Sequence, residues 1–207
     1  NMDRSSVNIL FLFVPLFLVS GKSFSQNHTD VSIFRSINNH HSPFSDHFFL
    51  FQSATVKPVY VGLPLGFLAT GIIQKNKKAQ DAGTLMAATA VFNFGVTTGM
   101  KYLVDRKRPF ETLSNVHTKG TLETSPSFPS GHTSAAFAMA TILSLNYPKW
   151  YVIIPSYAWA SLAGYSRMAI GMHYPSDVLI GAVVGAGSAF LIYELKKPIL
   201  ELKNKIF

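Results

Sequence analysis

The chain has 207 residues, with 18 lysines and arginines against 10 aspartates and glutamates, a formal net charge of +8, and 14% charged beside 48% hydrophobic residues. So few charges exclude a disordered chain, and the length suits one domain. The absence of cysteine excludes disulfide frameworks, thiolate metal sites and cysteine nucleophiles. The basic residues stand in short loops between apolar blocks and form no single basic face, which favours anionic lipid or phosphate over nucleic acid as the ligand.

Blocks without any charged residue recur along the chain and predict an all-α helical bundle. They are residues 7–20, 59–73, 82–100, 133–147, 151–165 and 178–193. A membrane-spanning helix needs about 20 apolar residues, whereas shorter runs are typical of buried core helices, so the block lengths leave both a membrane bundle and a soluble all-α domain open. The blocks are rich in Gly, Ala, Ser and Thr, small residues that let helices approach closely.

The distribution of lysine and arginine favours the membrane bundle. If the blocks alternate in direction, with residues 1–6 on the cytoplasmic side, the inner segments hold nine of these residues in 31 positions and the outer segments nine in 82. Cytoplasmic loops of membrane proteins carry the higher density of lysine and arginine. We therefore expect transmembrane helices, with residues 101–132 and 166–177 on the outer side.

The first block has two interpretations. Arg4, an apolar run and small residues up to Ser25 resemble a cleavable secretory signal, and the same block also suits a retained first helix. We therefore treat residues 1–26 as a signal-like or first transmembrane segment and residues 27–207 as the domain. The expected bundle has six transmembrane helices if this segment is retained and five if it is cleaved.

Three polar clusters stand at the outer ends of the apolar blocks. In the first, Lys101-Tyr-Leu-Val-Asp-Arg-Lys-Arg108-Pro109, the spacing predicts that Lys101 and Arg108 lie on one helical face two turns apart. Two cations so placed would clamp an anion, although basic residues at a membrane edge also extend towards lipid headgroups without any catalytic role. Pro109 is expected to mark the end of regular helix.

The second cluster, Pro126-Ser-Phe-Pro-Ser130-Gly131-His132-Thr133, runs directly into the block at 133–147 and predicts a helix entrance. Ser130 can cap the helix or donate to a ligand, and Gly131 lets its N–H approach an anion that the helix dipole also favours. His132 adds a titratable proton donor. An ordinary Pro/Ser/Gly turn is the alternative.

The third cluster, Ser166-Arg167-Met-Ala-Ile-Gly-Met-His173-Tyr-Pro175-Ser-Asp177, joins the end of one block to the start of the next. Pro175 suits a first helical turn, and Asp177, four residues after His173, can accept the imidazole Nδ1–H. Nε2 of His173 is then a nucleophile with a free lone pair. A structural His–Asp pair is the alternative, and it is disfavoured because the same loop holds an Arg167 that we expect to be unpaired.

Together the clusters supply three cations, a serine hydroxyl, a glycine amide, two histidines and an aspartate. A phosphate dianion needs donors around its nonbridging oxygens, a nucleophile in line with the leaving oxygen and an acid to protonate that oxygen, and each need has a candidate. Metal-dependent phosphatases need carboxylate clusters. Near the clusters the carboxylates are only Asp105, Glu111, Glu123 and Asp177, so we expect a phosphoryl-transfer site without metal or cofactor.

The three clusters resemble the motifs of the type 2 phosphatidic acid phosphatase (PAP2) superfamily, K-x6-RP, PSGH and SR-x5-H-x3-D. Every fixed position of these motifs is filled, in the family's order. The resemblance covers roughly residues 44–195 and implies an all-α bundle, whose integral-membrane branch places the motifs at the outer face of six spans. Residues 27–207 would then be a PAP2-type phosphatase domain.

The resemblance also implies a role for each site residue. His173 is the nucleophile that forms a phosphohistidine, Asp177 holds its tautomer, and His132 protonates the leaving group and later activates water. The phosphate-binding residues are Lys101, Arg108, Ser130, Gly131 and Arg167. The expected enzyme is a lipid phosphate phosphatase in the bilayer of a bacterial inner membrane, with its active site facing the periplasm or outside. Its expected substrates are phosphatidate, phosphatidylglycerol phosphate, a lipid A phosphate or an isoprenyl diphosphate.

Three other functions stay open on the sequence. A secreted soluble non-specific acid phosphatase of the same superfamily would require cleavage near Ser25. A vanadate-dependent haloperoxidase shares the motifs but is usually much longer. A non-catalytic lipid-binding membrane protein would need the cations but no oriented nucleophile. The motifs specify neither the lipid nor the oligomeric state.

Overall fold

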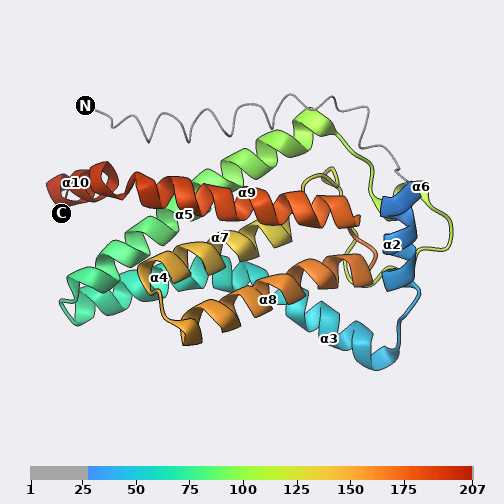
Figure 1. Ribbon diagram of the computed structural model, residues 1–207, viewed down its shortest axis with the longest axis horizontal. Coiled ribbons are helices and arrows are strands. Elements are labelled where there is room, and N and C mark those ends of the chain that lie inside the picture. Colours follow the sequence, from blue (N-terminus) through green and yellow to red (C-terminus); the bar gives the residue numbers. More distant parts are fainter. Residues whose placement is uncertain (1–27, 207) are drawn as a thin grey trace.

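Residues 28–206 are described by the computed structural model, and every regular element in this part of the chain is a helix (Figure 1). The predicted all-α bundle is confirmed. The signal-like or first transmembrane segment predicted at residues 1–26 lies outside the described residues. In chain order the helices are α2 (His28–Asn38), α3 (Pro43–Ala54), α4 (Val56–Ile73), α5 (Lys77–Val104), α6 (Pro109–Thr112), α7 (Gly131–Asn146), α8 (Trp150–Ala169), α9 (Pro175–Glu194) and α10 (Lys196–Ile206).

The apolar blocks predicted after residue 28 coincide with α4, α5, α7, α8 and α9. By length and composition, two helices of the described residues can cross a membrane. They are Pro43–Ile73, which joins α3 to α4, and Pro175–Glu194, which is α9. The bundle of six transmembrane helices therefore stays a prediction.

Helix α7 lies at the centre of the bundle and packs against α5, α8 and α9 (Figure 1). Its Met139 and Ile142 are buried in one apolar core with Leu85 and Met86 of α5 and Ile192 of α9. This core fills the half of the bundle away from the polar clusters, and its burial stabilises the helices that carry them.

Two glycines explain how closely α9 approaches α7. A Cβ atom on Gly181 would lie 2.7 Å from the carbonyl oxygen of Ser130, and one on Gly185 would lie 2.1 Å from that of Ser134. No side chain fits at such distances, so only glycine allows this packing. The close approach brings the start of α7 against the start of α9, where the second and third polar clusters stand.

The connections alternate between the two ends of the bundle, as predicted (Figure 1). The loops that follow α5 and α8 gather at one end with α2 and α6, whereas the α4–α5 and α7–α8 turns lie at the other end. All three polar clusters are therefore at the same end.

One local prediction is wrong: Lys101 and Arg108 do not share a helical face. Helix α5 ends at Val104, because Asp105 adopts the left-handed conformation (φ +48°) and its N–H bonds back to the carbonyl of Lys101. Arg108 lies beyond this cap in an extended conformation (φ −79°, ψ 159°). The two cations approach the site from a helix and from a loop.

Candidate active site

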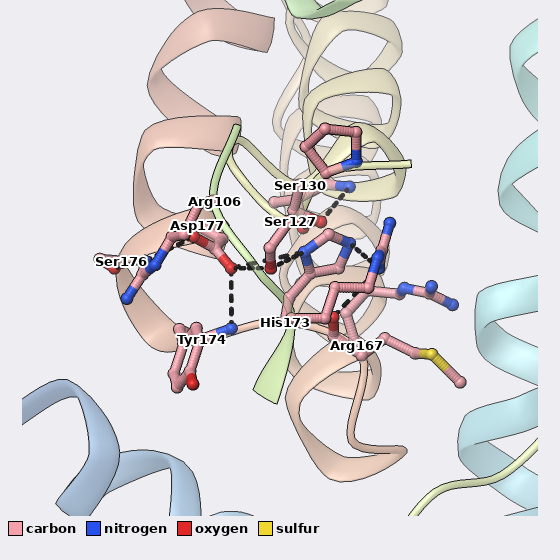
Figure 2. Close-up of polar contacts among 12 residues, drawn as sticks. Arg106, Ser127, Ser130, Arg167, His173, Tyr174, Ser176 and Asp177 are labelled. Atoms are coloured by element: carbon pink, nitrogen blue, oxygen red, sulfur yellow. Dashed lines mark hydrogen bonds and ion pairs between the residues drawn. The ribbon is translucent and has the colours of Figure 1, made fainter. Parts of the chain in front are cut away.

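The three polar clusters meet where α5 and α8 end and where α7 and α9 begin (Figure 2). His173, in the loop between α8 and α9, is fully buried. Backbone hydrogen bonds fasten the clusters to one another: the N–H of Ser127 donates to the carbonyl of Arg106 (2.7 Å), and the N–H of Ser130 donates to that of Asp177 (2.9 Å). The site is therefore assembled from chain segments that are far apart in the sequence.

The Nε2 atom of His173 faces Arg108, whose Nη1 lies 3.3 Å away. A guanidinium can only donate, so Nε2 carries the lone pair and Nδ1 the proton. Burial lowers the pKa of His173 well below its usual value, and the charges of Arg108 and Arg167 lower that pKa further. The ring is neutral, which is the state in which Nε2 can attack an electrophile.

On the other side of the ring, a serine stands between His173 and Asp177 (Figure 2). The hydroxyl of Ser127 lies 3.3 Å from Nδ1 of His173 and donates to Oδ2 of Asp177 at 2.5 Å. The direct separation of Nδ1 and Oδ2 is 3.5 Å. Asp177 therefore orients the imidazole partly through Ser127, whereas the sequence predicted a direct hydrogen bond.

The aspartate is itself held in place from two sides. As the third residue of α9, Asp177 accepts the N–H of Tyr174 at 2.9 Å, which caps the helix. Its other oxygen accepts from Nη1 of Arg106 at 2.6 Å. Arg106 reaches Asp30 of α2 at 2.7 Å and lies 4.2 Å above the ring of Tyr174. Arg106 thus links the start of the described chain to the aspartate behind His173.

Glu123 occupies the centre of the cationic group. Its Oε2 pairs with Arg108 at 2.6 Å, its Oε1 pairs with Arg167 at 2.5 Å, and the same Oε1 lies 3.5 Å from Nδ1 of His132. Although burial raises the pKa of Glu123, the neighbouring positive charges, with Arg167 the strongest, hold it at about 2. The carboxylate is ionised and pairs with the two arginines that the sequence predicted as phosphate-binding residues.

Arg167 is therefore not unpaired, as the sequence suggested. Besides Glu123, it donates to the hydroxyl of Ser53 at 2.8 Å. Its Nε is buried and has no hydrogen-bond partner among the described residues. Leaving a buried donor unsatisfied costs free energy, and a ligand oxygen would relieve that cost.

The remaining predicted phosphate-binding residues lie around the start of α7. Ser130 caps the helix, because its hydroxyl accepts the N–H of Thr133 at 3.4 Å, so the predicted helix entrance is confirmed. The ammonium of Lys101 donates to the carbonyl of Pro126. A Cβ on Gly131 would meet only Cε of Lys101, at 3.8 Å. Protein packing does not require glycine here, and its bare backbone leaves room for a ligand.

A cavity of about 290 Å³ opens beside the second histidine. Lys101, Gly131 and His132 form part of its wall. The rest of its wall comes from α4, α5 and α7, namely Val56, Lys57, Tyr60, Asn93, Phe94, Thr97, Thr98 and Ala135. An elongated, mainly apolar substrate group fits such a wall.

Sequence reasoning missed three residues of this site. Arg106 and Ser127 stand inside the first two clusters, and the visible signals were a second arginine two residues before Arg108 and a serine beside Pro126. Glu123 was considered only as a poor metal ligand. Nothing in the sequence could place it among the arginines, because its position depends on the path of the irregular chain between α6 and α7.

A buried neutral histidine beside two arginines has the chemistry for phosphoryl transfer, with a nucleophile next to groups that can hold phosphate oxygens. The sequence matches the PAP2 superfamily over residues 81–199, which is more than half of the chain. The chain belongs to the PAP2 superfamily, as its motifs predicted.

Relatives of known name agree with this membership. An undecaprenyl-diphosphatase of Sulfolobus acidocaldarius is 27% identical over 203 residues, which cover 96% of this chain and 94% of that protein. The undecaprenyl-diphosphatase BcrC of Bacillus subtilis is 30% identical over 182 residues, covering 84% of this chain and 90% of that protein. By homology the chain is a lipid phosphate phosphatase.

A solved structure shares the fold. The first transmembrane PAP2-type phosphatidylglycerolphosphate phosphatase from Bacillus subtilis matches with a TM-score of 0.70 and 23% identity, covering 94% of this chain and 96% of that one. At this identity the likeness shows that the two chains have the same helical architecture.

Proposed function

We propose that this protein hydrolyses lipid phosphate monoesters or diphosphates without a metal ion, through a phosphohistidine on His173. The observation that carries the proposal is the state of that imidazole. Its Nε2 points at Arg108, and its Nδ1 is held by Ser127 and Asp177. Both carboxylates of the site, Asp177 and Glu123, are paired with arginine, so arginines supply the positive charge for the reaction.

In the first step the substrate phosphate displaces Glu123 from Arg108 and Arg167. Lys101, Ser130 and the N–H of Gly131 complete the set of donors around the nonbridging oxygens. Nε2 of His173 attacks phosphorus while the bond from phosphorus to the leaving oxygen breaks. His132 takes a proton from the phosphate monoanion as it binds and gives that proton to the leaving oxygen. The products are the dephosphorylated lipid and a phosphohistidine, whose Nδ1–H is stabilised by Asp177 and Ser127.

In the second step His132, now neutral, takes a proton from a water molecule. The oxygen of this water attacks phosphorus, the bond from phosphorus to Nε2 of His173 breaks, and inorganic phosphate leaves. His132 passes this proton to the departing phosphate and is neutral again, so the cycle closes without any oxidant, reductant or metal.

We infer an isoprenyl diphosphate as the first substrate to test, because both undecaprenyl-diphosphatases align over most of their length. The apolar wall of the 290 Å³ cavity suits a hydrocarbon chain next to the leaving oxygen. Phosphatidate, phosphatidylglycerol phosphate and lipid A phosphates are the alternatives, since the donors of the site would hold only the phosphate group that all these lipids share.

The proposed setting is a bacterial inner membrane, with six spans if the first segment is retained and with the active site facing the periplasm. The higher density of lysine and arginine at the opposite end supports this orientation. Exposed apolar side chains on the bundle, such as Val91, Phe94, Ile154 and Leu179, suit contact with lipid.

The orientation is testable because the chain has no cysteine. Single cysteines placed by Thr121→Cys at the active-site end and Lys77→Cys at the other end can be exposed to a membrane-impermeant maleimide in cells with a permeabilised outer membrane. We expect labelling of Thr121→Cys alone. Labelling of Lys77→Cys alone would reverse the orientation, and release of the protein without detergent would support the secreted soluble phosphatase.

The activity itself is tested with purified protein in mixed micelles containing excess EDTA. We expect phosphate release from an isoprenyl diphosphate to exceed that from phosphatidate and from a soluble aryl phosphate, and we expect vanadate to inhibit it. Loss of activity in EDTA, from a protein whose unfolding temperature is unchanged, would contradict the metal-free reaction. No phosphate release from any substrate would favour a non-catalytic lipid-binding protein.

A further inference from the structure

A second group of potential ligands lies outside the active site, beside the start of α3. Ring nitrogens of His41 and His117 and a carboxylate oxygen of Asp46 all lie within 4.8 Å of one another. His41 precedes α3, Asp46 is in its first turns, and His117 belongs to the loop between α6 and α7. The three residues line a cavity of about 430 Å³, together with His47 and Lys119.

The cluster is held in a defined geometry. Nε2 of His117 lies 3.0 Å from both carboxylate oxygens of Asp46, which is buried. The backbone of His117 is fixed by the buried Asn38, which accepts its N–H at 2.9 Å and donates to its carbonyl at 2.8 Å. The same Asn38 amide donates to the carbonyl of Ala169 at 3.0 Å. Two of the three ligands are therefore positioned before any ion binds.

We propose that His41, Asp46 and His117 bind one divalent transition-metal ion, with zinc as the reference case. Zinc and the other divalent first-row transition metals prefer a ligand set of this kind, with two imidazole nitrogens and one carboxylate oxygen. Magnesium and calcium prefer oxygen ligands. A water molecule or His47, which lines the same cavity, completes a tetrahedral site. With the ion bound, the proton of the neutral imidazole of His117 stands on Nδ1, which leaves the lone pair of Nε2 to coordinate.

The site requires one side chain to move. The rings of His41 and His117 stack at a centroid separation of 3.7 Å with an interplanar angle of 4°, so their nitrogen lone pairs lie in parallel planes. A shared ion needs ligand atoms about 3.3 Å apart and lone pairs that converge. His41 is exposed, so its ring is free to rotate and meet these conditions.

Among the residues that line this cavity, Lys119 is the one cation that would compete with a metal ion for Asp46. Its ammonium lies 3.5 Å from Oδ2 of Asp46, but the side chain is 44% exposed. An ion pair as exposed as this one contributes little to stability, so a metal ion can easily displace Lys119 from Asp46. The ion would then join the loop between α6 and α7, which carries Glu123, to α3, so its role is structural and separate from phosphoryl transfer.

The test is zinc titration of the untagged, full-length protein in detergent, by calorimetry and by thermal unfolding. We expect one zinc ion per chain and a rise in the unfolding temperature. His41→Ala should weaken zinc binding at least ten-fold and abolish the thermal shift. This variant changes an exposed side chain outside the helices, so its fold should be intact. Equal binding by His41→Ala, or no stoichiometric binding by the parent, would overturn the proposal.

Matched variants separate this site from other histidines. His40→Ala, at the neighbouring exposed position, and His173→Ala, in the active site, should bind zinc as the parent does. Lys119→Ala should bind zinc at least as tightly as the parent. Loss of binding in His173→Ala with retention in His41→Ala would place the ion at the active site, and weaker binding by Lys119→Ala would contradict the position beside Asp46.

Discussion

Glu123 and Arg167 form a 2.5 Å ion pair in the cationic centre of the candidate active site. The glutamate also pairs with Arg108, so the protein itself supplies an anion to its two arginines. This carboxylate neutralises charges that would otherwise be buried without partners, at a large cost. It also competes with any phosphate for the same donors.

The first prediction follows from this competition. Glu123→Gln removes the internal charge but keeps the shape, so vanadate should inhibit the variant about five- to ten-fold more tightly, a gain of about 1 kcal/mol for an anion that no longer displaces a carboxylate. The measurement is the inhibition constant for vanadate. Glu201→Gln, at an exposed position on α10, should behave as the parent, and unchanged or weaker inhibition of Glu123→Gln would show that the glutamate does not occupy the phosphate position.

Ser127 gives a second prediction. Ser127→Ala removes the hydroxyl between His173 and Asp177, so the imidazole loses part of its orientation. We expect kcat to fall about 10- to 100-fold, the loss expected for a hydrogen bond to a charged group, with little change in KM. Ser156→Ala, whose hydroxyl bonds only within α8, is the control. Full activity of Ser127→Ala would mean that Asp177 alone holds the ring.

Arg106 supports the third prediction. Arg106→Gln leaves Asp177 without its 2.6 Å partner and Asp30 without its 2.7 Å partner. We expect kcat to fall at least ten-fold and the unfolding temperature to fall as well, because two buried carboxylates lose their counter-ion. Asp30→Asn should lower kcat less, since it keeps the contact of Arg106 with Asp177. Equal losses in kcat for both variants would indicate a purely structural network.

The fourth prediction concerns pH. The pKa of His173 is lowered by burial and then by Arg108 and Arg167, whereas in the unfolded chain it lies near the ordinary value of about 6.5. Below that pH the unfolded state binds a proton that the folded state does not. The free energy of unfolding should therefore decrease as the pH is lowered below about 6.5, by up to about 1.4 kcal/mol per pH unit from this group.

His173→Gln isolates this contribution. Its unfolding temperature, measured between pH 7 and pH 5, should fall less steeply than that of the parent. His40→Gln, at an exposed position, should follow the parent. Parallel curves for His173→Gln and the parent would show that His173 is not held neutral in the folded protein.

Local sequence signals predicted the elements that surround the site. Charge-free blocks predicted α4, α5, α7, α8 and α9, and the Pro-Ser-Gly sequence predicted the start of α7 at Gly131. Pro175 correctly marked the first turn of α9. These features depend on neighbours in the chain, which a sequence displays directly.

Features set by tertiary structure were not predictable. The seven-residue spacing of Lys101 and Arg108 suggested one helical face, but the left-handed Asp105 ends α5 between them. Asp30 meets Arg106 across 76 positions of sequence. Glu123 reaches the arginines through a loop without regular structure. In each case the position of the side chain depends on the packing of the bundle, which no local sequence pattern encodes.

The central claim is that phosphate passes through a covalent bond to His173. The most direct measurement is a single-turnover experiment with a labelled aryl phosphate, quenched in alkali and followed by peptide mapping. The parent and His132→Ala should carry acid-labile, alkali-stable phosphate on His173, with more of it in His132→Ala because water activation is slower. His173→Ala should carry none. Labelled phosphate on His173→Ala, together with its absence from the parent and from His132→Ala, would contradict the account.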